Sequence, residues 1–160
     1  MQLVFEDFMK MLHELDNSLV ENITIKVIGG FSVIINSKVL GLDLDCDGWL
    51  NNSWYDSKAF NEELEQYIEW QDFNEEKFKH ITLKYADLES IFLFKVRAVN
   101  DVITGKSVIH DRPRDNDMYD IIHILDFFNE KDILNIQNPK MSIAIEMYRP
   151  AIEWIAKYMR

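Results

Sequence analysis

The chain has 160 residues, of which 48% are hydrophobic and 12% aromatic, which is enough for one sizeable core and argues against an intrinsically disordered chain. Seventeen Lys and Arg residues oppose 28 Asp and Glu residues, and the net charge of −11 disfavours nucleic acid and anionic membranes, although a local basic patch would leave nucleic acid open. The single cysteine, Cys46, excludes an internal disulfide. No apolar run is long enough to span a membrane and no signal peptide is recognisable, so the sequence predicts a cytoplasmic protein.

The first part of the chain shows a helical pattern and then strand-like patterns. Apolar residues recur every three or four positions over residues 4–19, which predicts an amphipathic helix. Residues 23–28 read as a strand that ends at Gly29 and Gly30. Residues 31–35 then read as a short helix, and residues 43–47 as an acidic strand.

The rest of the chain is richer in helical patterns. The sequence predicts, in order, a helix over residues 56–70, a strand over 77–83, helices over 87–103 and 115–128, and a helical segment over 141–160 with a break near Pro150. We therefore expect one α+β domain over residues 1–160, with a small mixed β-sheet flanked by helices and a helix-rich C-terminal half.

Three aspartates alternate along the acidic strand. A strand sends Asp43, Asp45 and Asp47 to one face, with Asp43 and Asp45 about 6–7 Å apart. Such like charges repel one another unless a cation or water lies among them. Glycines allow a backbone to turn tightly and to approach a ligand without a Cβ in the way. The combination favours a divalent metal held by carboxylates beside a phosphate-binding turn.

Two other interpretations of the acidic segment remain open. Asp43, Asp45, Asp47 and Gly48 match positions 1, 3, 5 and 6 of an EF-hand calcium loop, but position 12 is Trp54 and lacks the bidentate Glu. The segment could also be a solvated acidic turn that binds no metal.

The order of the two motifs resembles a known family. A Gly-Gly turn at Gly29 and Gly30, followed by Asp43 and Asp45 on the next strand, is similar to the signature of the nucleotidyltransferase fold. A later set of residues is similar to the pattern of uncharacterised bacterial nucleotidyltransferase-like proteins, which are related to the toxin half of abortive-infection toxin–antitoxin pairs: Lys95, Arg97, Arg114, Asp115, Asp120 and Ile121. The resemblance covers a core of about residues 23–128 and leaves 129–160 as a helical C-terminal part.

The resemblance implies roles for five residues. Gly29 and Gly30 would lie against the phosphates of a nucleoside triphosphate, and Lys95 would contact a phosphate. Asp43 and Asp45 would be the catalytic residues and would bind Mg²⁺ or Mn²⁺, which neutralises charge on the transferred phosphoryl group.

The resemblance leaves two functions open. Active members of the family carry a third carboxylate on a later strand, and the predicted strand at residues 77–83 offers none. The chain could therefore be an enzyme that transfers a nucleotidyl group to a protein or RNA acceptor. Alternatively, it could be a catalytically degenerate binding protein, such as a toxin–antitoxin component with a protein partner.

Lys95 also stands out from the pattern of its own helix. It falls within an apolar stripe formed by Leu88, Ile91, Phe92, Val99 and Val102. An unpaired ammonium is costly in a dry core, so the lysine should be paired or should face a polar cleft. We predict a cleft shared with Asp43 and Asp45.

Overall fold

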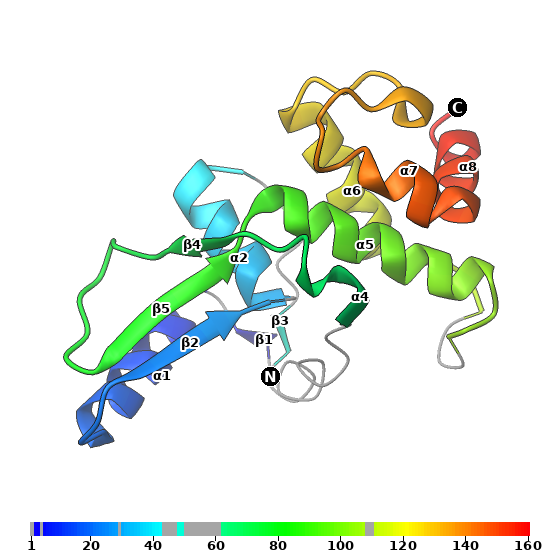
Figure 1. The fold of residues 1–160 in the computed structure, drawn as a ribbon. Coiled ribbons are helices and arrows are strands. Elements are labelled where there is room, and N and C mark those ends of the chain that lie inside the picture. The colour runs from blue at the N-terminus through cyan, green and yellow to red at the C-terminus, as the bar shows by residue number, and fades with distance from the viewer. Residues whose placement is uncertain (1, 4, 29, 43–47, 50–61, 108–110) are drawn as a thin grey trace. The chain divides into compact units, whose positions relative to one another are not determined.

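The computed structural model describes residues 2–3, 5–28, 30–42, 48–49, 62–107 and 111–160. The chain divides into two compact units, Met1–Asp87 and Leu88–Arg160 (Figure 1). The prediction of an α+β chain with a small mixed sheet and a helix-rich C-terminal half is confirmed. None of the described helices is both long and apolar enough to cross a membrane.

The N-terminal unit contains all of the described strands. Its elements are β1 (Gln2–Leu3), α1 (Phe5–Ser18), β2 (Ile23–Val27), α2 (Gly30–Leu40), β3 (Gly48–Trp49), α4 (Glu62–Glu65), β4 (Trp70–Asp72) and β5 (Ile81–Ala86). The three-stranded sheet has the order β2-β5-β4, in which β5 runs parallel to β2 and antiparallel to β4. A separate antiparallel pair joins β1 to β3.

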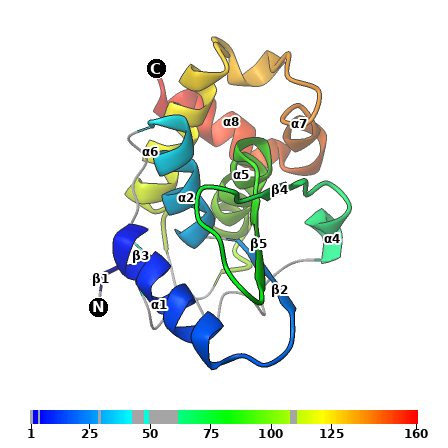
Figure 2. The ribbon, with the colours of Figure 1, turned by 90° about the vertical axis from the view of Figure 1, so that its left-hand side faces the viewer.

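The core of the N-terminal unit lies between the sheet and two helices. Alternation along β5 sends Ile81, Leu83 and Tyr85 to one face, and all three are buried. Helices α1 and α2 cover this face, as Figure 2 shows. They contribute Phe8, Met9, Leu12, Phe31, Ile34 and Ile35 to the cluster.

A single carboxylate fixes the loop that precedes β5. The backbone N–H of Lys79 donates to Oδ2 of Asp16 at 2.7 Å, and those of His80 and Ile81 donate to Oδ1 at 2.7 and 3.1 Å. Burial by itself would raise the pKa of Asp16, but the three hydrogen bonds, helped by the charge of nearby His80, hold it below its ordinary value of 3.8. Asp16 therefore links the end of α1 to the start of the central strand.

Replacing Asp16 by Asn should destabilise the protein and reduce its sensitivity to acid. The amide keeps the shape but presents an N–H₂ group to backbone donors, and it loses the charge that strengthens the three bonds. Because folding lowers the pKa of Asp16, its contribution is present above the unfolded-state value of 3.8 and is lost as the pH falls through the folded-state value. Urea unfolding from about pH 5 to about pH 2 should show a smaller loss of stability in Asp16→Asn than in wild type.

The matched control is Glu14→Gln, which removes one charge from an exposed position on the same helix. It should follow the wild-type pH dependence. Parallel pH curves for Asp16→Asn and wild type would contradict the role assigned to the carboxylate.

The regular elements of the C-terminal unit are all helices within its described residues. Its elements are α5 (Leu88–Ile103), α6 (Asp115–Phe127), the 3₁₀ turn η2 (Ile133–Asn135), α7 (Ile143–Met147) and α8 (Arg149–Tyr158). Helix α5 supplies Ile91, Phe92 and Val96, each at most 1% exposed. The predicted break near Pro150 lies at Tyr148, and Pro150 occupies the first turn of α8, where its missing N–H costs nothing.

Three of the predicted elements differ from the structure. The helix predicted over residues 56–70 is present only as α4 within the described residues, and Trp70 belongs to β4, where it pairs with Ala86. The strand predicted over 77–83 starts later, at Ile81, because Asp16 takes the N–H groups of the residues just before it. The helix predicted over 31–35 is longer and extends to Leu40.

Candidate functional site

The sheet brings two chain segments to one edge. Strands β2 and β5 are parallel and in register from Ile23 opposite Ile81 to Val27 opposite Tyr85, so their carboxyl ends lie at the same edge. Helix α2 begins at Gly30, three residues after β2 ends, and Asp87 directly follows β5. In open α/β sheets, ligands bind at the carboxyl edge of the parallel strands.

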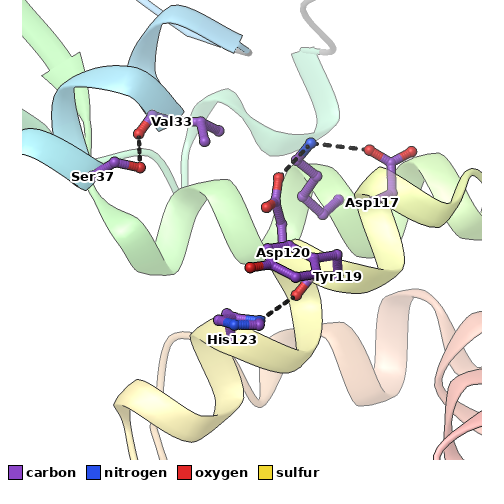
Figure 3. Close-up of polar contacts among 7 residues, drawn as sticks. Val33, Ser37, Asp117, Tyr119, Asp120 and His123 are labelled. Carbon is purple, nitrogen blue, oxygen red and sulfur yellow. Dashed lines mark hydrogen bonds and ion pairs between the residues drawn. The ribbon is translucent and has the colours of Figure 1, made fainter. Parts of the chain in front are cut away.

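Buried polar groups tie α2 to this edge. The side-chain amide of Asn36 donates to the carbonyl oxygen of Ala86 at 2.9 Å and to that of Ser32 at 2.8 Å. Asn36 is 3% exposed and Ser32 is fully buried. One turn further along, the Ser37 hydroxyl donates to the carbonyl oxygen of Val33 at 2.8 Å (Figure 3). The bond from Asn36 to Ala86 joins the helix to the end of β5, and the other two bonds lie within α2.

Asp87 is the carboxylate that sequence analysis missed at this edge. Its N–H donates to the carbonyl oxygen of Glu69 at 3.1 Å, which continues the β4–β5 ladder by one residue. Alternation from Leu83 and Tyr85 therefore places Asp87 on the face that α2 covers, and it is buried. The error came from the strand boundary, because a strand ending at Leu83 leaves Asp87 in the next helix.

The structure describes only one of the residues predicted from the Gly-Gly and acidic motifs. Gly30 is the first residue of α2. Gly29, Asp43, Asp45 and the neighbouring Asp47 lie outside the described residues. Among the residues that are described, no three His, Cys, Asp or Glu side chains come together as a possible metal group.

Lys95 forms a buried ionic cluster in the C-terminal unit. Its Nζ lies 3.0 Å from Oδ1 of Asp117 and 3.1 Å from Oδ2 of Asp120, both on α6. Figure 3 shows the two carboxylates on α6 with the dashed lines of these ion pairs converging between them. The side chain of Lys95 is 19% exposed, that of Asp117 10% and that of Asp120 0%. Lys95 is thus paired, which is one of the two arrangements expected for a cation in an apolar stripe. The predicted cleft shared with Asp43 and Asp45 involves residues that lie outside the described ones.

The electrostatics of the cluster favour the charged lysine. Burial alone would lower the pKa of Lys95, but the charges of Asp117 and Asp120 outweigh burial and raise it. Two carboxylates against one ammonium leave the cluster with a formal charge of −1. A phosphate that approached this ammonium would therefore meet a cluster that is already negative overall.

The sequence held a signal for the partners of Lys95. Asp117 and Asp120 occupy core positions of α6, since they share its buried face with Ile121 and Ile124. An aspartate on the apolar face of a helix needs a cation or several hydrogen-bond donors. Lys95, on the apolar face of the preceding helix, was the matching cation.

Comparisons with protein-family models, with curated proteins and with solved structures found no match to this chain.

Proposed function

We propose that the N-terminal unit binds a nucleoside triphosphate together with Mg²⁺ or Mn²⁺ and transfers its nucleotidyl group to a protein or RNA acceptor. The observation that supports this most directly is the start of α2 at Gly30, on the shared carboxyl edge of the parallel strands β2 and β5, with Asp87 following β5. A nucleotidyltransferase-like arrangement of turn, helix and acidic strand would use this edge.

The start of α2 has the chemistry of an anion site. Its first turn carries no acidic side chain, and the first turn of a helix points backbone N–H groups toward a bound anion. Gly30 places no Cβ between this backbone and a ligand. We assign the phosphate contacts of the proposed site to Gly29 and Gly30, because Lys95 is already neutralised by two carboxylates.

The charge of the N-terminal unit explains why a metal would be needed. Residues 1–87 contain seven Lys and Arg residues against 17 Asp and Glu residues, a net charge of −10. Such a unit would repel a triphosphate unless a divalent cation screened the phosphate charges from the carboxylates of the protein. Asp43 and Asp45 supply carboxylate oxygens, the ligands that Mg²⁺ prefers, and Asp87 is a candidate for the third carboxylate.

The alternative is a degenerate fold that binds nucleotide or a protein partner without catalysis. Its main support was the lack of a third carboxylate in the predicted strand over residues 77–83. The position of Asp87 at the end of β5 weakens that support and favours the enzyme.

Calorimetric titration of Mn²⁺ should detect this site. Wild type should bind the ion, and Asp45→Asn should weaken binding by at least about 10–100-fold, the loss typical of a group that only supports a metal ligand. Asp87→Asn should weaken it by about the same factor if Asp87 supports the ion.

The control for both variants is Asp7→Asn, which removes an exposed carboxylate from α1 in the same unit. It should bind Mn²⁺ as wild type does. Identical isotherms for wild type and Asp45→Asn would remove the metal from the proposal. If Asp45→Asn weakens Mn²⁺ binding and Asp87→Asn does not, the metal site stands and only the role of Asp87 as the third carboxylate is excluded.

A further inference from the structure

One side of α6 carries a row of three ring side chains. Tyr119, His123 and Phe127 lie four residues apart, so they fall on one side of the helix. Tyr119 is 37% exposed and Phe127 43%, and His123 is half-buried. The rings of Tyr119 and His123 stack with centroids 4.1 Å apart (Figure 3). We call Tyr119, His123 and Phe127 the aromatic row.

The aromatic row is ordered by local contacts. Nδ1 of His123 lies 3.1 Å from the carbonyl oxygen of Tyr119, and the ring of Phe127 meets that of Phe128 edge-on at 5.0 Å. Rigid aromatic side chains lose little conformational entropy when a partner covers them, and aromatic residues dominate the energetic centres of protein interfaces. Single exposed apolar residues are common on protein surfaces, but here two exposed aromatic residues, Tyr119 and Phe127, lie on one side of the helix with His123 between them.

Acidic residues border the aromatic row on one side. Asp115 and Asp126 are both exposed, and helical geometry puts them within about 40° of Tyr119 around the α6 axis. A partner that covers the row would meet these carboxylates at its rim. Charge complementarity therefore favours a partner with Lys or Arg beside its apolar side chains.

The same charges disfavour a second copy of this chain as the occupant. Two α6 helices packed antiparallel, about a two-fold axis perpendicular to them, would carry their acidic borders on the same side of the contact. Four aspartates would then lie along one rim, and like charges at an interface are costly. The net charge of −11 on each copy adds to this repulsion.

We propose that the aromatic row of α6 is a docking surface for a basic amphipathic helix of a partner protein. The partner helix places an apolar stripe on Tyr119, His123 and Phe127 and its basic residues against Asp115 and Asp126. This surface belongs to the C-terminal unit and does not depend on the proposed nucleotide site.

The proposal can be tested with two synthetic helical peptides of opposite charge, LKKLLKLLKKLLKL and LEELLELLEELLEL, each carrying a fluorescent label. Fluorescence anisotropy should show that the wild-type protein binds the basic peptide and not the acidic one. The double variant Tyr119→Ser/Phe127→Ser should weaken binding by at least about tenfold, which corresponds to about 1.4 kcal/mol. Asp115→Asn/Asp126→Asn should weaken it by a smaller factor and should flatten its salt dependence.

The matched control is Leu134→Ser, which removes a 44% exposed apolar side chain from η2 in the same unit. It should bind the basic peptide as wild type does. Equal binding of both peptides, absence of binding, or unchanged binding in Tyr119→Ser/Phe127→Ser would overturn the proposal. A wild-type dimer that dissociates in Tyr119→Ser/Phe127→Ser would also overturn it, because a second copy would then be the occupant.

Discussion

Lys95→Met is expected to lower the free energy of unfolding by about 3–5 kcal/mol, the cost of breaking a buried ion pair from one side. Methionine keeps the length and the apolar stem of the lysine, so packing changes little. The loss comes from Asp117 and Asp120, which would remain buried without their cation. Urea unfolding followed by circular dichroism measures the change.

Two further variants separate the charge effect from packing. Lys106→Met removes an exposed lysine from the same unit and should leave stability within about 0.5 kcal/mol of wild type. Adding Asp117→Asn and Asp120→Asn to Lys95→Met should restore part of the lost stability, because no buried charge is then left uncompensated. Wild-type stability of Lys95→Met would show that the ion pairs contribute nothing.

The same variant tests the phosphate role that the family resemblance implies for Lys95. A direct contact with a phosphate predicts a loss of about 1.5–3 kcal/mol in triphosphate binding, the value for a charged hydrogen bond. The structural pairing predicts no such loss at temperatures where Lys95→Met is folded. ATP titration at a low temperature distinguishes the two roles.

Gly30→Val is expected to abolish nucleotide binding while the protein stays folded. A branched Cβ at the start of α2 would occupy the space through which a phosphate approaches the backbone N–H groups. Valine costs a helix only a fraction of about 1 kcal/mol, so the fold should tolerate it. Titration with ATP and with GTP measures the effect.

Leu40→Val is the control, because it puts the same β-branched residue at the other, exposed end of α2. It should bind nucleotide as wild type does. A folded Gly30→Val protein with wild-type affinity would move the phosphate site away from Gly30.

Local sequence patterns correctly predicted the helices whose own apolar residues recur with the helical period. The helices α1, α5 and α6 match their predicted ranges to within about two residues, because each has a long apolar face with the helical period. The start of β5 depended on something else, the carboxylate of Asp16, which lies 65 residues before Ile81. A local sequence pattern cannot reveal a contact between residues that are so far apart in the chain.

The candidate site, too, could be predicted from the sequence only in part. The glycines and the alternating aspartates were visible as motifs, and the cost of a buried cation predicted that Lys95 is either paired or open to a polar cleft. The partners of Lys95 and the position of Asp87 were not identified, because they depend on which helix faces which and on where β5 ends. Tertiary packing and strand register decide both.

Binding of ATP in the presence and absence of a divalent metal tests the proposed function most directly. Wild type should bind ATP with Mn²⁺ present and at least about tenfold more weakly with EDTA, a difference of about 1.4 kcal/mol. Asp45→Asn should show the weak affinity under both conditions. Equal ATP affinity of wild type with Mn²⁺ and with EDTA, or no binding under either condition, would contradict the account.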